Sequence, residues 1–439
     1  MKYRMKSKSA YLCLLLSLAL LTGSGCGGPV QGEVPEVPIS SETAFSQAGE
    51  LDSAAEQSQP KAEESASEPQ EALSIPDQPP ETGPTPEPAP EDPQPPEIRL
   101  VMVGDILLHT PLAESGRTPE GSYDFSAVFA NLKEEIQGAD VALVNQEVII
   151  GGAELGVSGY PSFNAPYELG DALMEAGFDI VLHATNHALD KGKQGLLNCL
   201  SFWRENYPDT PVLGIHDSRE SQQEIYVYEQ QGIRIAILNY TYGTNGISLP
   251  EDMPYAVDLL EKERVIDDLQ RAQELADFVV VCPHWGKEYV LEQVKSQESW
   301  AQIFVENGAD LILGTHPHVI EPIEQITSEN GNQALVYYSL GNFVNWTSGT
   351  GAGVSNRMVG GMAQVTIGLD ENGEAVITDY GVLPVVCHLE KGFGGVTVYP
   401  LSEYTEELAA HNEILKQDES FSLDYCWELV RGVFGDVVK

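Results

Sequence analysis

Side chains that can bind metal ions recur at the ends of short apolar runs in this sequence. Five separate runs, rich in Val, Ile and Leu, are each followed within a few residues by His, Asp, Glu or Asn. Imidazole and carboxylate together form the donor set of borderline divalent metals, so Mn, Fe or Zn is favoured over Ca. No cysteine stands at these positions, which argues against a structural zinc knot. The candidate metal ligands are Asp105, His109, Glu147, Asn186, His284, His316 and His318.

The apolar runs also predict the elements that position these side chains. They alternate with helix-like segments, which is the pattern of buried strands in an α/β sheet. In open α/β sheets, loops from separate strands converge outside the carboxyl ends of the strands, where ligands bind. We therefore predict an α/β fold in which the strand ends meet at one metal site. The runs occupy residues 98–103, 140–144, 178–185, 278–281 and 310–313.

The last run ends in Gly-Thr-His-Pro-His, residues 314–318. Pro317 fixes the backbone between His316 and His318, so the two rings can point to different places, one for each of two metals. Taken alone, the segment would also fit a polar turn that happens to contain histidine, and the other four strand ends favour the metal site. The remaining histidines are interpreted as structural or exposed: His183, His216, His388 and His411.

The charge of the chain argues against one large class of function. The formal net charge is −44 at pH 7, and the residues after Glu97 include 51 acidic and 18 basic side chains. Nucleic-acid binding needs a positive surface for phosphate contacts, so no nucleic-acid partner is expected. An anionic substrate would need local positive charge, which bound metal ions would supply.

Residues 1–26 have the composition of an export signal. Four basic residues between Lys2 and Lys8 precede the run YLCLLLSLALL, which is too short to span a bilayer comfortably, and TGSGCGG follows. Cys26 among glycines predicts an extracytoplasmic protein anchored to the cell membrane by a lipid, although Gly23 stands where a lipoprotein signal usually has Leu. The alternatives are secretion after plain cleavage and a retained signal anchor.

Composition divides the rest of the chain into three parts. Residues 27–97 are rich in Pro, Glu, Ser, Ala and Gln and contain one cation, Lys61. Such a segment cannot bury enough apolar surface to offset its ordering entropy, so a disordered tether is predicted. Residues 98–399 are predicted to form the metal-binding domain, and residues 400–439 a C-terminal helical extension.

Six segments between Ile98 and Phe343 occur in a recognisable order: GDILLH, NQE, ATNHALDKG, PHWGKEY, GTHPHVIEP and YYSLGNFV. In this order they resemble the CapA family of poly-γ-glutamate capsule proteins, which belongs to the calcineurin-like metallophosphoesterase superfamily. A weaker resemblance continues near Pro384. The resemblance implies a two-layered β-sandwich flanked by helices, the metallo-dependent phosphatase-like fold, with two metal ions at the strand ends.

The resemblance also implies a role for each candidate ligand. Glu147 would bridge the two ions, at a position where the superfamily more often has Asp. One ion would be held by Asp105 and His318, with His109 as a third ligand. The superfamily has its first Asp and His one residue apart, whereas His109 lies four residues beyond Asp105. The other ion would be held by Asn186, His284 and His316.

Two further residues are candidates for catalysis. His187 is similar to the superfamily histidine that contacts the substrate phosphate, and Asp190, three residues later, would orient its ring. His187 would then protonate the leaving group or hold the transition-state oxygens.

A third group of residues is assigned to substrate binding. Aromatic residues of the HWGKEY segment would line a groove, with core packing as the alternative. Residues of the YSLGNF segment would stand at the cleft rim, with a tight turn as the alternative. Lys287 and Arg357 are cations that could meet an anionic substrate. The candidate substrate-binding residues are Trp285, Lys287, Ser339 and Asn342.

These features together predict an exported metal-dependent hydrolase of the phosphoesterase type, acting on poly-γ-glutamate capsule or another cell-envelope polymer. The substrate would be an anionic polymer or a phosphoester. One alternative is a non-catalytic, surface-tethered component of poly-γ-glutamate synthesis or export that acts with membrane capsule-synthesis proteins. This alternative fits the signal and tether, but an acidic domain repels a polyanion. A metal-dependent binding module is the other alternative.

Overall fold

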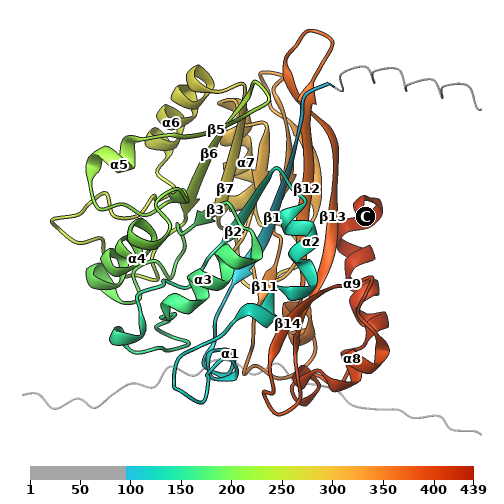
Figure 1. Ribbon diagram of the computed structural model, residues 1–439. Coiled ribbons are helices and arrows are strands. Elements are labelled where there is room, and N and C mark those ends of the chain that lie inside the picture. Colours follow the sequence, from blue (N-terminus) through green and yellow to red (C-terminus); the bar gives the residue numbers. More distant parts are fainter. Residues whose placement is uncertain (1–94) are drawn as a thin grey trace, which may run out of the picture. The chain divides into compact units, whose positions relative to one another are not determined.

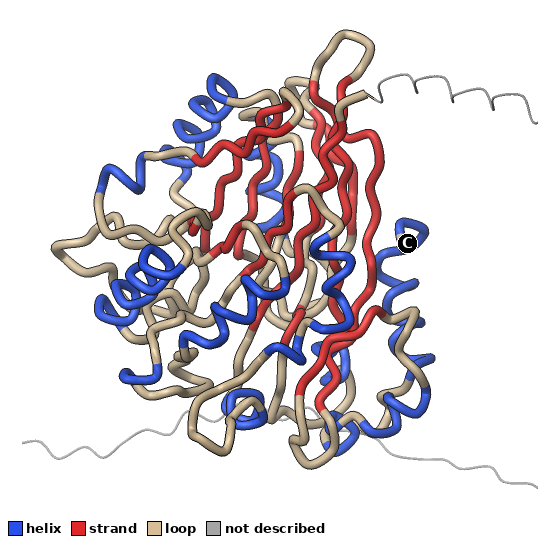
Figure 2. The backbone as a smooth tube through the Cα atoms, in the orientation of Figure 1, coloured by secondary structure: helices blue, strands red, loops and turns tan. Residues whose placement is uncertain are grey.

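Figure 1 shows the computed structural model, which describes residues 95–439. The predicted export signal and the predicted tether up to residue 94 lie outside the described residues. The strands form two sheets, and helices cover their outer faces (Figures 1 and 2). In the described part of the chain, no helix combines the length and apolar character that crossing a bilayer requires.

The first sheet has eight strands, with order β14-β13-β12-β1-β2-β3-β4 and β11 paired to β1. Strands β1 to β4 are parallel to one another, and β12 to β14 extend the sheet from β1 in antiparallel fashion. Their bounds are β1 Glu97–Ile106, β2 Val141–Asn145, β3 Ile180–Leu182, β4 Val212–Leu213, β11 Asn342–Val344, β12 Val359–Leu369, β13 Ala375–Leu389 and β14 Val396–Pro400.

The second sheet has six strands, in the order β5-β6-β7-β8-β10-β9. The four central strands are parallel, and an antiparallel strand closes each edge. Their bounds are β5 Tyr226–Gln230, β6 Ile233–Thr241, β7 Phe278–His284, β8 Leu311–Leu313, β9 Ile323–Thr327 and β10 Gln333–Tyr337.

Alternating side chains of the second sheet show how the layers pack. Phe278, Val280 and Cys282 of β7 belong to the core that contains the first sheet, whereas Val279 and Val281 belong to a second core with helices α6 and α7. Successive strand residues point to opposite faces, so a strand buried on both sides reads as a continuous apolar run. The predicted two-layered β-sandwich flanked by helices is therefore confirmed.

Nine α-helices lie in the described part of the chain. Helices α6 and α7 cover the outer face of the second sheet through residues such as Leu269 and Phe304. Helices α3, α4 and α9 contribute to the core of the first sheet. The helix bounds are α1 Thr110–Ser115, α2 Lys133–Gln137, α3 Tyr167–Ala176, α4 Gly192–Asn206, α5 Arg219–Gln223, α6 Lys262–Leu275, α7 Lys295–Glu306, α8 Glu406–His411 and α9 Leu423–Phe434.

The residues after Pro400 pack against the same domain. They form α8 and α9, which lie beside β13 and β14 (Figure 1). Cys426, Val430 and Phe434 of α9 are buried in the core of the first sheet. These helices therefore share their core with the sandwich.

Candidate metal centre

Asp105 lies near the carboxyl end of β1 and is fully buried. The Asn145 side-chain amide donates to its Oδ1 at 2.8 Å, and the backbone N–H of His316 lies 3.2 Å from its Oδ2. Burial, together with the charge of Glu147, raises the pKa of Asp105 above its ordinary value. Contacts with β2 and with the loop after β8 therefore hold the Asp105 carboxylate in place.

Glu147 follows β2 by two residues, and its side chain has no exposed surface. Neither of its carboxylate oxygens has a hydrogen-bond partner. Burial would raise the pKa of Glu147, but the charges of His318 and His284 outweigh it and hold this pKa well below its usual range. A buried ionised carboxylate costs several kcal/mol unless positive charge compensates it. The two free oxygens therefore call for cations at this point.

His318 lies between the two carboxylates. Its Nδ1 is 3.2 Å from Asp105 Oδ2 and 3.7 Å from Glu147 Oε2. Burial would lower the pKa of His318, but the charges of Glu147 and Asp105 raise it to about 9. Asp105, Glu147 and His318 thus form one group whose ligand atoms all lie within 4.8 Å of one another. This group attracts positive charge strongly, as a divalent-cation site must.

A second group contains Glu147 again, together with His284 and His316. His284 Nε2 lies 2.9 Å from the Asn186 side-chain oxygen and 3.6 Å from Glu147 Oε1. Metal–nitrogen and metal–oxygen bonds of about 2.0–2.2 Å separate two neighbouring ligands of one ion by roughly 3 Å, so the His284–Asn186 spacing fits a shared ion. His316 Nδ1 is buried without a partner, which leaves it free to coordinate.

His318 of the His-Pro-His segment belongs to the first group and His316 to the second, and both belong to a further group with Glu288. Both residues have positive backbone φ angles, 99° for His316 and 59° for His318. Residues other than Gly seldom adopt this region, although Asn, Asp and His do so more often than the rest, and each instance costs of the order of 1–3 kcal/mol. The backbone is therefore strained at the two residues that carry the ligands.

Together the two groups show that the described residues suit a divalent-metal site. Nitrogen and oxygen donors converge, both free oxygens of Glu147 lie where the groups meet, and no cysteine takes part. A third group joins His316 and His318 to the exposed Glu288. His109 belongs to none of these groups, and its ring packs edge-on against Phe163 at 4.9 Å. Burial and the charge of His318 lower the pKa of His109 to about 4.

His187 and Asp190 lie beside the metal groups. His187 Nδ1 is 2.7 Å from Asp190 Oδ2, and its Nε2 is 3.9 Å from Glu147 Oε1. The Asp190 carboxylate also accepts from the backbone N–H of Phe163 at 2.6 Å, and the Phe163 ring packs edge-on against His187. The ring of His187 is therefore held on one side by Asp190, while its other nitrogen faces Glu147.

The structure corrects three of the substrate-binding predictions. Trp285 is 1% exposed, stacks against Phe304 and donates its indole N–H to the Tyr338 carbonyl, so it belongs to the core under α7 and not to a groove. Ser339 is buried and donates to the Val319 carbonyl, and so it ties the loop after β8 in place. This bond has a structural role, in line with the alternative of a tight turn.

Asn342 is the third correction. Its amide N–H donates to the His318 carbonyl, and its side-chain oxygen lies 3.1 Å from His318 Nδ1. Asn342 is fully buried beneath the cluster, so it orients His318 and does not stand at the cleft rim. Lys287, by contrast, is exposed on the loop after β7.

Residues that the sequence did not single out also support the cluster. Asn145 holds Asp105, and Thr315 Oγ1 lies 3.0 Å from His284 Nδ1. Tyr242, in the loop after β6, packs its ring 4.6 Å from the ring of His316. Asn145 and Thr315 stand next to strand ends already identified, so their position in the sequence could have marked them as neighbours of the site. No pattern in the sequence marks Tyr242.

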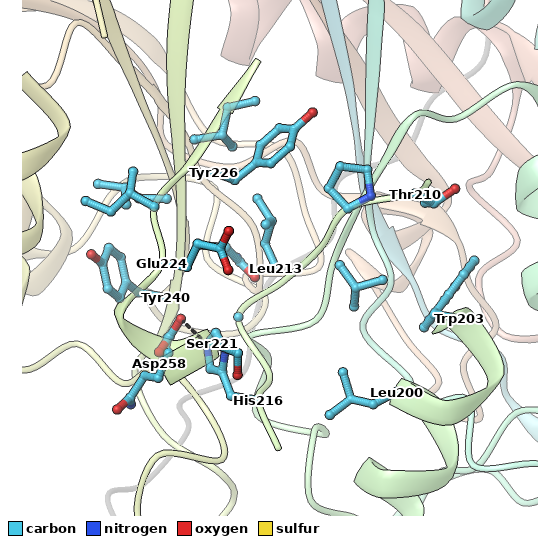
Figure 3. Close-up of a pocket in the computed structure, with 18 of the residues that line it drawn as sticks. Leu200, Trp203, Thr210, Leu213, His216, Ser221, Glu224, Tyr226, Tyr240 and Asp258 are labelled. Carbon is cyan, nitrogen blue, oxygen red and sulfur yellow. Dashed lines mark hydrogen bonds and ion pairs between the residues drawn. The ribbon is translucent and has the colours of Figure 1, made fainter. Parts of the chain in front are cut away.

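A cavity of about 330 Å³ lies against this cluster and includes His109 and His318 in its wall. A larger cavity of about 500 Å³ lies elsewhere, between β4 and the β5–β6 edge of the second sheet (Figure 3). His216 lies there with its Nε2 2.7 Å from Asp258 Oδ2, and Arg264 also pairs with Asp258. No candidate ligand lines this larger cavity, and His216 belongs to none of the ligand groups among the described residues.

Glu321, in the loop that follows the His-Pro-His segment, makes the stability of the native state depend on pH. Its side chain is buried, with one oxygen accepting from the Gln297 amide and the other without a partner. Burial raises the pKa of Glu321 to about 8. Between the unfolded pKa near 4.5 and a folded pKa near 8, the native protein holds a proton that the unfolded chain has lost, so stability falls as pH rises through this window.

We expect Glu321→Gln to remove this loss of stability at high pH. At pH 5 the variant and the wild type should differ little, because both side chains are neutral in the native state. At pH 9 the variant should be more stable by a few kcal/mol, since each pKa unit corresponds to about 1.4 kcal/mol. Urea unfolding at both pH values measures the difference. Exposed Glu324 is the control, and an equal response of Glu324→Gln would refute the assignment.

Comparison with known proteins identifies the family. Residues 99–347, more than half of the chain, match the family described as bacterial capsule synthesis protein PGA_cap, and the chain therefore belongs to this family. It is 33% identical over 179 residues to the PGA biosynthesis protein CapA of Bacillus subtilis (strain 168), covering 40% of this chain and 45% of that protein. It is 27% identical over 263 residues to the capsule biosynthesis protein CapA of Bacillus anthracis, covering 57% and 61%. The chain thus spans about half the length of these curated relatives.

Solved structures with a similar arrangement include two nucleotidases. The NAD nucleotidase of Haemophilus influenzae has a TM-score of 0.43 at 14% identity, covering 79% of this chain and 64% of that chain. The 5′-nucleotidase precursor of Thermus thermophilus has a TM-score of 0.39 at 14% identity, covering 76% and 59%.

Proposed function

We propose that this capsule-family protein is a metal-dependent hydrolase of the phosphoesterase type, acting on a capsule or cell-envelope polymer. The observation that carries the proposal is Glu147: a fully buried carboxylate with two unpartnered oxygens, shared by two groups of ligands. Such an arrangement does little for folding, because buried carboxylate oxygens without hydrogen-bond partners cost free energy in the native state. It suits a site where two cations lie side by side.

The residues would hold two ions of Mn, Fe or Zn. Asp105 and His318 would bind one, Asn186, His284 and His316 the other, and Glu147 both. When bound, the ions would activate water for attack and neutralise charge on the substrate oxygens. They would also bring positive charge to a chain whose net charge is −44.

His187 is the proposed proton donor. With Nδ1 hydrogen-bonded to Asp190, the ring is fixed in one orientation, and Nε2 is the nitrogen that faces the cluster. A proton on Nε2 could pass to the leaving-group oxygen as its bond breaks, or could hold a transition-state oxygen. Asp190 would keep the ring in place and stabilise the charged imidazolium.

A substrate screen tests the proposal. Full-length protein is loaded separately with Mn²⁺, Zn²⁺ or Fe²⁺ and assayed on 4-nitrophenyl phosphate, bis(4-nitrophenyl) phosphate and γ-linked glutamate peptides. We expect metal-dependent hydrolysis of a phosphoester, lost on chelation and in Asp105→Ala. Failure of the metal-replete wild type on every substrate would contradict the hydrolase proposal.

The names of the two Bacillus relatives favour a second candidate function. One relative is named as a PGA biosynthesis protein and the other as a capsule biosynthesis protein, and neither name refers to degradation. A non-catalytic role in poly-γ-glutamate synthesis or export, with membrane capsule-synthesis proteins as partners, would follow this description. Restoration of capsule by an Asp105→Ala protein in a deletion strain would favour the second candidate, whereas failure to restore it would favour metal-dependent activity.

The location outside the cytoplasm is also a proposal, resting on the composition of residues 1–26 and on Cys26. We propose a lipid anchor on the outer face of the cell membrane, with secretion as the alternative. Membrane fractionation and intact mass of the wild type and of Cys26→Ala distinguish them. An unchanged mass and an unchanged membrane fraction in the variant would contradict lipidation.

A further inference from the structure

The cavity beside His318 has a lining that contrasts with the charge of the domain. None of its 13 lining residues in the described part of the chain is acidic. The larger cavity in Figure 3 has four acidic residues in its wall, among them Asp258 and Glu224. In a domain with 51 acidic and 18 basic side chains after Glu97, a cavity wall without carboxylates is suited to an anion. Exposed Glu288, which joins His316 and His318 in the third group, lies outside this wall.

Arg357 is the only Lys or Arg among those lining residues, and its side chain has an unusual set of contacts. Its guanidinium lies 3.5 Å from the centre of the Tyr289 ring, and Nη1 donates to Thr347 Oγ1 at 2.9 Å. Its Nε is buried without a hydrogen-bond partner. Among the described residues, no carboxylate lies within 4.0 Å of it to form an ion pair. The guanidinium therefore keeps unused donors beside the cavity.

A purely structural role would not account for these contacts. Stacking on Tyr289 adds little stability, because this ring is 47% exposed and cation–π contacts are weak at exposed sites. The structural hydrogen bonds of this residue come from its backbone, because the Arg357 carbonyl accepts from the Asn342 and Asn345 amides. The aromatic ring and Thr347 instead fix the plane of the guanidinium, which prepares it to bind a planar or tetrahedral anion through paired N–H groups.

The position of Arg357 relates it to the metal groups. The Tyr289 ring on which it stacks lies 5.9 Å from the His318 ring, measured between ring centres. Arg357 and His318 thus line one cavity, with a single aromatic ring beside both. An anion on Arg357 would lie near the substrate group at the metals, but on separate protein ligands.

We propose that Arg357, Thr347 and Tyr289 form a second anion-binding subsite next to the metal centre. This inference rests on the proposed function and deepens it: the substrate carries a carboxylate or phosphate beyond the group that the metals bind. A repeating anionic polymer or a doubly anionic ester has this chemistry. The subsite would select such substrates over esters with one anionic group.

Binding of non-hydrolysable probes tests the subsite without turnover. Metal-loaded full-length protein is titrated calorimetrically with phenylphosphonate, with the meta and para isomers of carboxyphenylphosphonate, and with 1,4-phenylenebisphosphonate. We expect at least one of the probes with two anionic groups to bind about 10- to 100-fold more tightly than phenylphosphonate, which has one. This is the range for hydrogen bonds to a charged group. A gain confined to the carboxylate probes or to the bisphosphonate identifies which anion the subsite takes.

Arg357→Gln should abolish this gain while leaving phenylphosphonate binding and metal content unchanged. The matched control is Arg431→Gln, because Arg431 also lies over an aromatic ring, that of Trp427 at 5.2 Å, but on α9 outside the cavity. The control should keep the full gain. Equal binding of all probes by the wild type, or a gain that persists in Arg357→Gln, would overturn the subsite.

The substrate screen and the probe titration distinguish failure of the hydrolase proposal from failure of the subsite proposal. If the screen finds no turnover but the gain disappears in Arg357→Gln, the subsite stands and the protein binds its polymer without cleaving it. If phosphoesters are hydrolysed but no probe shows an Arg357-dependent gain, the hydrolase stands and the subsite is wrong.

Discussion

Glu147→Gln is expected to weaken metal binding by at least about 100-fold while the protein remains folded. The amide has nearly the same shape as the carboxylate but carries no charge and offers one oxygen instead of two. It therefore cannot serve both groups of ligands. Loss of residues that merely orient metal ligands costs about 10- to 100-fold in affinity, so loss of a shared ligand should cost at least the upper value. Metal analysis of the purified full-length protein measures the effect.

Thermal unfolding gives a second readout with a definite sign. A metal that binds only the native state raises the unfolding temperature of the wild type, and this rise should vanish in Glu147→Gln. In chelator, the variant should lose some stability, because it removes the attraction between the Glu147 carboxylate and the charged His318. Glu321→Gln is the control, since it places an amide at another buried carboxyl group outside the ligand groups. Normal metal content in Glu147→Gln would rule out a bridging role.

His187→Ala is expected to lower turnover by roughly 10²- to 10⁴-fold, the usual range for a lost general acid, while metal content stays near that of the wild type. His187 Nε2 faces Glu147 from 3.9 Å, and the residue belongs to none of the ligand groups. The measurements are kcat on the substrate found by the screen, bound metal and unfolding temperature.

His216→Ala is the matched control, because His216 also pairs with an aspartate at 2.7 Å but lies at the other cavity. It should leave kcat and metal content unchanged. Asp190→Asn should reduce kcat less than His187→Ala, and its unfolding temperature must be followed because Asp190 also accepts from the Phe163 N–H. Loss of metal in His187→Ala would instead make His187 a ligand.

The convergence of the ligands could be predicted because it depends on local patterns. Three of the apolar runs form strands of the first sheet and two form strands of the second, and the loops after their carboxyl ends converge, so Asp105, Glu147 and His316 meet although they are far apart in sequence. The pairing of His187 with Asp190 spans three residues and needs no tertiary information. The sandwich and its flanking helices were predicted from the family resemblance, and the strand pattern agrees with it.

The assignment of Trp285 to a groove was wrong for a reason that the sequence contains. Along β7, side chains alternate between the two cores, with Val279 and Val281 on the helix side. Trp285 continues this odd-numbered series, whereas His284 has the other parity and reaches the cluster. Counting in steps of two from Val281 would have placed Trp285 in the core under α7.

Other features could not be predicted because they depend on contacts between distant segments. Asn342 meets His318 across 24 residues, and Ser339 meets Val319 across 20. Which of two cations would lie near the metals was equally open, since Lys287 and Arg357 follow no periodic pattern. Only the folded chain puts Arg357 into the cavity wall and leaves Lys287 exposed.

The positive φ angles of His316 and His318 bear on any attempt to engineer this protein. Glycine adopts such angles without strain, so a selection for heat resistance in the absence of metal ions would favour replacing both histidines. The same substitutions would delete a ligand from each group. Thermostability and metal affinity therefore oppose each other at these two positions, and a library screened only for folding would discard the metal centre first.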